Sequence, residues 1–134
     1  LDVGFKTIGI AVSDRSLIVA TPINTVLRKG TKKDLVKIKD FLTEYEIGGF
    51  IIGLPLSLNA SENEQTKKIR VFANELENYF SLPIEYWDER YSSDIIFKEM
   101  RKSDLSKTKI KKKLDQQSAA YILQGYLDKY RNPY

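Results

Sequence analysis

The fold of this chain is decided by its first stretch, Leu1-Asp2-Val3-Gly4-Phe5-Lys6-Thr7-Ile8-Gly9-Ile10-Ala11-Val12-Ser13-Asp14. An acid lies inside an apolar strand, Gly4 begins a tight turn, and a second apolar strand runs back. Burying a carboxylate costs free energy unless the group is paired or binds a cation. Asp2 is therefore either one partner of a buried ion pair or a metal or phosphate ligand at the centre of a sheet.

The composition is that of one globular domain, residues 1–134, with 42% hydrophobic and 30% charged residues. Apolar runs stay well below the ~20 residues that a membrane helix needs, no signal peptide is visible, and the absence of cysteine fits a cytoplasmic protein. Because Leu1 already lies in strand-like sequence, we expect the first strand to be truncated at its amino end.

The missing residue types restrict the chemistry. Without histidine or cysteine, zinc sites built on these ligands are excluded, which leaves oxygen-ligated Mg²⁺ or Mn²⁺ as candidate metals. The net charge of +4 mildly favours a polyanionic partner.

Hydrophobic periodicity divides the chain into strands and helices. Strands are expected at 1–4, 7–13 and 17–23, the last an edge strand because it contains Pro22, and again at 50–54 and 84–88. Capping boxes at Thr31 with Asp34 and at Ser61 with Glu64 predict the starts of two helices. A further helix is expected at 93–100. A final helix follows the basic run 101–113 and carries Ala119, Ile122, Leu123, Tyr126, Leu127 and Tyr130 on one stripe.

This order predicts an α/β fold with a five-stranded mixed sheet. Three antiparallel strands precede two α/β crossovers, so the first, fourth and fifth strands should be parallel, with helices on both faces. Ligands of such sheets gather beyond the carboxyl ends of the parallel strands, here residues 2–4, 54–55 and 88–89.

Acidic residues converge on that edge. Asp2 lies on the first strand, Asp88 and Glu89 leave the fifth, and Asp115 opens the final helix on its inward stripe. Each acid alone could pair with a base or favour a helix start. Together they are typical of carboxylates around Mg²⁺, the arrangement that phosphoryl-transfer chemistry uses.

Four segments together resemble a known family. These are Asp-Val-Gly-x-Lys-Thr-Ile-Gly-Ile-Ala-Val-Ser-Asp, Ile-Ile-Gly-Leu-Pro-Leu, Trp-Asp-Glu-Arg and Asp-x-x-Ser-Ala-Ala-x-Ile-Leu-Gln-Gly-Tyr-Leu, in that order over essentially the whole chain. The chain thus resembles the YqgF or RuvX family of pre-16S rRNA nucleases. The resemblance implies an RNase H-like fold related to Holliday junction resolvases. It also implies a cytoplasmic hydrolase of phosphodiesters that processes the 5′ end of pre-16S rRNA during ribosome biogenesis.

The resemblance also implies roles for single residues. Asp2 and Asp115 match the metal ligands, and Asp88, Glu89 and Arg90 match the Asp-Glu-Arg motif. Because strand neighbours point to opposite faces, only one of Asp88 and Glu89 should face the metal, and we favour Glu89. Arg90 would contact phosphate or fix an acid.

The chain departs from the family at several positions. Phe5 stands where a small or hydroxyl residue is usual, and the segment 53–55 offers no acid, which would leave a thinner metal site. Trp87 and Tyr91 could stack on a base, although core packing is an equal reading of Trp87. Candidate nucleic-acid contacts are Lys6, Ser57, Asn59, Arg90, Arg101, Lys107, Lys109, Lys111, Lys112 and Lys113.

Other functions remain open. The alternatives are a Holliday junction resolvase acting on branched DNA and a non-catalytic factor that binds rRNA or ribosomal particles. A nucleotide-binding fold of the actin and sugar-kinase type needs two domains, and this length supplies one. We expect a nucleic-acid partner, no membrane, and a monomer or weak homodimer.

Overall fold

The structure is a computed structural model that describes residues 1–56, 62–88 and 107–131. Three antiparallel strands follow one another in the order β1 (Asp2–Val3), β2 (Thr7–Ser13) and β3 (Ala20–Leu27). Two parallel strands follow, β4 (Phe50–Leu54) and β5 (Ile84–Asp88). The predicted mixture of an antiparallel meander and parallel strands is therefore confirmed.

Two hydrogen bonds at the first residue join these groups of strands. The amino group of Leu1 donates to the carbonyl oxygen of Ile51 at 2.7 Å, and the amide of Gly53 donates to the carbonyl oxygen of Leu1 at 3.1 Å. Leu1 is thus hydrogen-bonded to two residues of β4 that are two positions apart, which is the pattern between parallel strands. The strands therefore lie in the order β3-β2-β1-β4-β5, with β1 in the middle.

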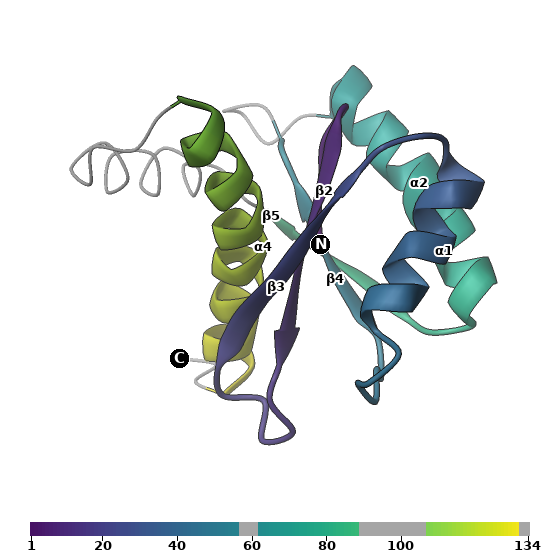
Figure 1. Cartoon of the computed structure of the whole chain (residues 1–134). Coiled ribbons are helices and arrows are strands. Elements are labelled where there is room, and N and C mark those ends of the chain that lie inside the picture. Colours follow the sequence, from purple (N-terminus) through teal and green to yellow (C-terminus); the bar gives the residue numbers. More distant parts are fainter. Residues whose placement is uncertain (57–61, 89–106, 132–134) are drawn as a thin grey trace.

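Helices lie on both sides of these strands (Figure 1). The helices α1 (Thr31–Phe41) and α2 (Glu64–Phe80) lie together on one side, and α4 (Lys107–Arg131) lies on the other. The main core fills the space between the sheet and the first two helices. It contains Leu1, Val3, Ile8, Ile10, Val26, Leu35, Ile38, Leu42, Phe50, Ile52, Leu54, Ile69, Phe72, Ala73 and Leu76. Within the described residues no helix is long and apolar enough to span a membrane.

The third strand begins later than predicted. Instead of covering 17–23 it starts at Ala20, and the apolar residues before it form an exposed hairpin tip. The carboxylate of Asp14 accepts hydrogen bonds from the amides of Ile18 at 2.7 Å and Val19 at 3.1 Å, and Leu17 has a φ of 57°. These contacts fold the segment into a turn. The expectation of an edge strand holds, and Pro22 lies within it.

Both predicted capping boxes were wrong. The first helix has Gly30 as its N-cap, without a side-chain hydrogen bond. In α2 the N-cap is Asn63, whose carboxamide oxygen accepts from the amide of Thr66 at 2.9 Å, while the hydroxyl of Thr66 accepts from the amide of Asn63 at 2.8 Å. Asn63 competes with the predicted Ser61 because both residue types cap helices well.

The final helix is longer than predicted. It begins at Lys107, so the second half of the basic run is helical and Asp115 lies two turns inside the helix rather than at its start. Ala119, Ile122 and Leu127 are buried as expected, but Tyr130 is 69% exposed. The helix expected at 93–100 lies outside the described residues.

Candidate active site

Asp2 lies on the central strand and points towards α4. Its neighbours Leu1 and Val3 are both buried in the core under α1 and α2. Side chains alternate between the faces of a strand, so the half-buried Asp2 faces the opposite side, which α4 covers. Its cross-strand partner on that face is Gly9. The position fits a functional carboxylate near the carboxyl end of a parallel strand.

Asp88 ends the fifth strand and belongs to the other face. Ile84 and Tyr86 pack against the core beneath α1 and α2, whereas Trp87 contacts α4. By alternation, Asp88 shares the face of Ile84 and Tyr86, opposite to that of Asp2. Glu89, the residue after the end of β5, lies outside the described residues.

The last helix brings position 115 to the same side of the sheet as Asp2. Ser118, Ala119 and Ile122 are each 2% exposed or less, and position 115 lies three, four and seven residues before them. That spacing places all four positions on the helix face that packs on the strands. The side chain of Asp115 itself lies outside the described part of the chain.

The side chain of Gln124 fixes α4 to the strands. Its carboxamide oxygen accepts from the amide of Ala20 at 2.9 Å, and its nitrogen donates to the carbonyl oxygen of Ile18 at 2.8 Å. Ile18 lies in the turn between β2 and β3, and Ala20 is the first residue of β3. One side chain thus sets the height of the helix against the sheet, and with it the level of position 115.

Sequence reasoning missed an ion pair that braces the turn after Asp2. The carboxylate of Asp34 is 1% exposed and accepts from Arg28 Nε at 3.2 Å and from the amide of Lys29 at 2.8 Å. Arg28 Nη1 in turn donates to the carbonyl oxygen of Gly4 at 3.0 Å. The backbone amide of Arg28 donates to the carbonyl oxygen of Lys6 at 2.9 Å. The turn is closed by the amide of Gly4, which donates to Thr7 O at 2.8 Å. The only sequence signal for this ion pair was Asp34 itself, whose spacing from Thr31 predicted a capping box instead.

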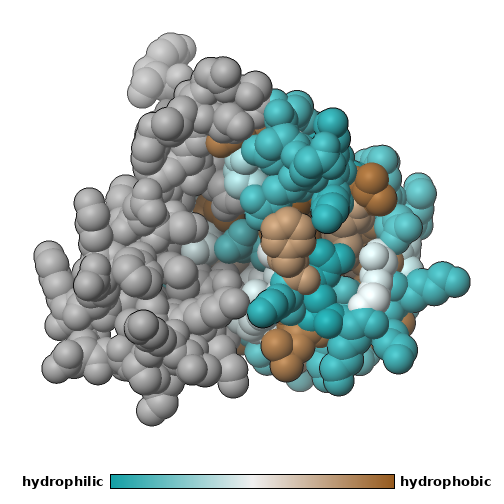
Figure 2. All heavy atoms as spheres, turned by 90° about the horizontal axis from the view of Figure 1, so that it is seen from above, coloured by the Kyte–Doolittle hydropathy of each residue, from teal (hydrophilic) through white to brown (hydrophobic). Residues whose placement is uncertain are grey.

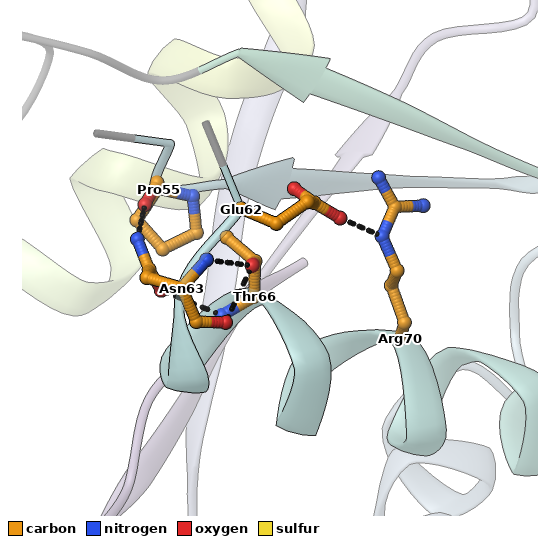
Figure 3. A network of polar contacts seen from close by, with 5 residues as sticks. All are labelled: Pro55, Glu62, Asn63, Thr66 and Arg70. Carbon is orange, nitrogen blue, oxygen red and sulfur yellow. Dashed lines mark hydrogen bonds and ion pairs between the residues drawn. The ribbon is translucent and has the colours of Figure 1, made fainter. Parts of the chain in front are cut away.

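A second polar network holds the carboxyl end of β4 (Figure 3). Asn63 Nδ2 donates to the carbonyl oxygen of Pro55 at 3.0 Å, so the N-terminus of α2 is tied to the end of the strand. Beside it Arg70 forms an ion pair with Glu62. Arg70 Cζ also lies 4.6 Å from the centroid of the Tyr86 ring. The hydrogen bond to Glu62 raises the pKa of Arg70. This network ties the amino end of α2 to the end of β4, and its one acid, Glu62, is paired with Arg70.

The predicted metal ligands are only partly within the described structure. Among the described residues, no three acidic, histidine or cysteine side chains gather closely enough to hold a metal ion. Of the predicted ligands Asp2, Glu89 and Asp115, only the side chain of Asp2 is described, and the predicted catalytic residue Asp88 lies on the opposite face from it. The ligand set therefore stays a prediction.

The predicted nucleic-acid contacts divide in the same way. Lys6 is exposed on the turn after β1. The positions of Lys107, Lys109, Lys111, Lys112 and Lys113 lie on the first two turns of α4, while Ser57, Asn59, Arg90 and Arg101 lie outside the described residues. The helical lysines thus precede position 115 on the same element.

Trp87 is a packing residue. A Cβ added at Gly125 would lie 3.1 Å from Trp87 Cζ2, so the indole presses against the backbone of α4. The ring of Tyr126 meets it edge-on at 6.3 Å. A hydrogen bond to Glu85 and burial raise the pKa of Tyr126 to about 12. The half-buried Trp87 thus packs on α4 and is not part of the main core, and its stacking on a base stays a prediction. Tyr91 lies outside the described residues.

A cavity of about 850 Å³ extends from the amino ends of the parallel strands as far as Leu1, the residue before Asp2. It is lined by the ends of β2 and the starts of β4 and β5, including Val12, Phe50 and Glu85, and by Tyr130 of α4.

The fold and the acid positions define an α/β protein whose candidate site lies where the central parallel strand ends beside α4. Comparison with known proteins gives the family. The model of the family described as "RuvX: Holliday junction resolvase" matches residues 1–129. The chain belongs to the RuvX family.

Curated relatives cover nearly the whole chain. A protein of Clostridium kluyveri is 42% identical over 129 residues, which are 96% of this chain and 94% of the relative. One of Thermoanaerobacter pseudethanolicus is 41% identical over 98% of this chain and 96% of the relative. One of Zymomonas mobilis is 38% identical over 97% and 79%. All three carry the name "Putative pre-16S rRNA nuclease".

Proposed function

We propose that this protein is a metal-dependent nuclease of RNase H-like fold that hydrolyses phosphodiester bonds in pre-16S rRNA. The observation that carries the proposal is the direction of Asp2. It lies on the central strand among apolar residues and faces α4, on which position 115 precedes the buried Ser118 by three residues. The names of the curated relatives support pre-16S rRNA as the substrate, and family membership supports a nuclease.

The proposed metal is Mg²⁺ or Mn²⁺, held by Asp2, Glu89 and Asp115. The chain has neither histidine nor cysteine, so its possible ligands are oxygen atoms, which both ions prefer. When bound, such an ion supplies Lewis-acid chemistry to a phosphoryl oxygen. Asp2 is well suited to hold it, because the turn that follows is braced by Arg28 and Asp34.

Strand alternation supports Glu89 over Asp88 as the metal ligand at the end of β5. Since Asp88 lies on the face of α1 and α2, it would have to reach around the end of the strand to approach Asp2. Glu89 follows on the side of Asp2 if the strand geometry continues by one residue. We therefore assign Glu89 to the metal, with Asp88 as a catalytic residue close behind it.

The lysines are proposed to hold the phosphate backbone of the substrate. The turn with Lys6 and the first two turns of α4 flank the candidate site at one end of the molecule (Figure 1). Cationic side chains beside an acidic site bind the flanking phosphates and make affinity depend on salt. Ser57, Asn59, Arg90 and Arg101 are proposed to join them.

The nuclease proposal is tested by cleavage of a pre-16S rRNA fragment in Mg²⁺. Asp2→Asn and Asp115→Asn should each lower the rate by about 100-fold or more, the loss expected when a metal ligand is removed. Asp40→Asn is the matched control, because Asp40 is an exposed acid on α1. Glu89→Gln should lose more activity than Asp88→Asn. Unchanged cleavage by both Asp2→Asn and Asp115→Asn would contradict the mechanism.

A second candidate substrate follows from the family description. Branched DNA is favoured by the match to a Holliday junction resolvase model. Cleavage of a four-way DNA junction, measured beside the rRNA fragment, separates the two. Metal-independent RNA binding without cleavage of either substrate would instead support a non-catalytic rRNA-binding factor.

The setting of this activity is also a proposal. We propose that the protein works in the cytoplasm, because rRNA is processed where ribosomes assemble. We propose a monomer or weak homodimer, which light scattering after gel filtration would measure directly. A tight dimer at micromolar concentration would contradict this part of the proposal.

A further inference from the structure

The turn after Asp2 carries an exposed aromatic ring. Phe5 is 65% exposed and lies three residues beyond Asp2. Single exposed apolar residues are ordinary on protein surfaces, so exposure alone does not mark a site. Three further observations set this ring apart: its rigid backbone, its partner cation and its place in the molecule.

The backbone that presents Phe5 is braced on both sides. Arg28 donates to the carbonyl oxygens of Gly4 at 3.0 Å and of Lys6 at 2.9 Å, so both neighbours of Phe5 are hydrogen-bonded to the same residue. Arg28 is in turn fixed by the buried carboxylate of Asp34. A ring on such a turn loses little conformational freedom when a ligand packs on it, which is how rigid aromatic side chains gain binding energy.

A cation lies over the ring. Lys68 Nζ of α2 is 5.0 Å from the centroid of the Phe5 ring, within the range of a cation–π contact. The ammonium group occupies one side of the ring, and the exposure of Phe5 leaves ring surface accessible. A flat apolar surface beside a positive charge matches a nucleotide, which has an aromatic base and an anionic phosphate.

The position of the ring relates it to the candidate site. Three residues of extended chain span at most about 11 Å, so Phe5 lies within about three stacked nucleotides of Asp2. Asp2 faces α4, whereas Lys68 over the ring belongs to α2, so a strand that reaches both would cross the turn between β1 and β2. Seen from this end, the described surface is mostly hydrophilic, with hydrophobic residues as small separate spots (Figure 2). An isolated aromatic ring among hydrophilic groups offers a base an apolar surface to pack on, although this surface has no large hydrophobic patch.

We propose that Phe5 and Lys68 form a stacking subsite for an unpaired base next to the phosphodiester held at Asp2. The ring packs against the base, and Lys68 neutralises the adjoining phosphate. The subsite selects nucleic acid that is single-stranded beside the bond to be cut, because a base inside a duplex offers no free face. This inference rests on the proposed nuclease function only for the position of the phosphodiester.

Binding measured without cleavage tests the subsite. In an Asp2→Asn background, the probes are a single-stranded RNA of about ten nucleotides that contains 2-aminopurine and the same strand in a duplex. Phe5→Ala should weaken binding of the single strand about 5- to 100-fold, as expected for loss of one base–aromatic contact, and should reduce the quenching of 2-aminopurine. Duplex affinity should change by less than about twofold, and Phe5→Trp should restore single-strand binding.

The control is Val36→Ala, which removes an exposed apolar side chain from α1. Equal single-strand affinity of Phe5→Ala and its parent, an equal loss on the duplex, or the same loss in Val36→Ala would each overturn the subsite. The two proposals fail separately. If wild-type protein cleaves nothing but Phe5→Ala still loses single-strand affinity, the nuclease fails and the subsite stands. If cleavage occurs and Phe5→Ala binds like its parent, only the subsite fails.

Discussion

Replacing Asp34 by alanine should destabilise the protein far more than any exposed acid would. The change removes a 1% exposed carboxylate that accepts from Arg28 and from the amide of Lys29. Removing one partner of a buried ion pair costs about 3–5 kcal/mol because the other charge loses its compensation. The side chain of Arg28 is 23% exposed and keeps its hydrogen bond to Gly4, so water and that carbonyl relieve part of the cost. We expect a loss of about 2–3 kcal/mol in the free energy of unfolding.

Two further variants separate charge from hydrogen bonding. Asp34→Asn keeps an oxygen for the amide of Lys29 and loses the charge, so it should cost about 1–2 kcal/mol. Combining Asp34→Ala with Arg28→Met removes both charges, and the double variant should be more stable than the sum of the single losses indicates. Asp40→Ala, on the exposed side of the same helix, should change stability by less than about 0.5 kcal/mol.

Urea denaturation followed by circular dichroism measures these values, and cleavage at 25 °C measures the effect on the turn. Asp34→Ala should lower the cleavage rate even where the variant is fully folded, because Arg28 then holds Gly4 less firmly. The reasoning would be refuted if Asp34→Ala lost no more stability than Asp40→Ala. It would equally be refuted if the losses of the two single variants were simply additive, since that would exclude coupling between Arg28 and Asp34.

Two other predictions follow from α4. Tyr126→Phe removes the hydrogen bond to Glu85 and should cost about 0.5–1.5 kcal/mol at pH 8. Because that contact raises the folded-state pKa of Tyr126 from 10.0 to about 12, its stabilisation is full below pH 10 and is lost as the pH rises through 12. The difference between variant and wild type in urea melts should therefore shrink over this range, and a difference that grows would contradict the assignment. Gln124→Leu removes two hydrogen bonds to the β2–β3 hairpin and should lower the free energy of unfolding by about 2 kcal/mol. Gln117→Leu, at an exposed position of α4, should lower it by less than about 0.5 kcal/mol. Equal stability of the two variants in urea would exclude a role of Gln124 in docking α4.

Much of the architecture could be read from local patterns. The period of apolar residues located β2, β4 and β5 to the residue, and the change from period two to period 3.6 marked the helices. Element ends were less predictable because neighbouring residues compete for the same role. Asn63 and Ser61 can both cap a helix, and only the contact of Asn63 with Pro55 favours one of them.

Some long-range contacts left almost no trace in the sequence. The apolar residues at 17–19 looked like a strand, but the carboxylate of Asp14 folds them into a hairpin tip. Asp34 had the spacing of a capping residue, yet it is buried against Arg28. In both cases a polar side chain finds a partner whose position depends on how the chain is folded.

Three features of the site could be read from the residues alone. Asp2 lies in an apolar strand, Asp88 ends a later strand predicted to run parallel to it, and the chain has no histidine or cysteine to act as a ligand. The packing of the helices settles the directions of Asp2 and Asp88, the two acids that the structure describes. Alternation along a strand fixes only that neighbours face opposite sides. Which side is which depends on where α1, α2 and α4 pack, and that packing turns Asp2 towards α4 and Asp88 away from it.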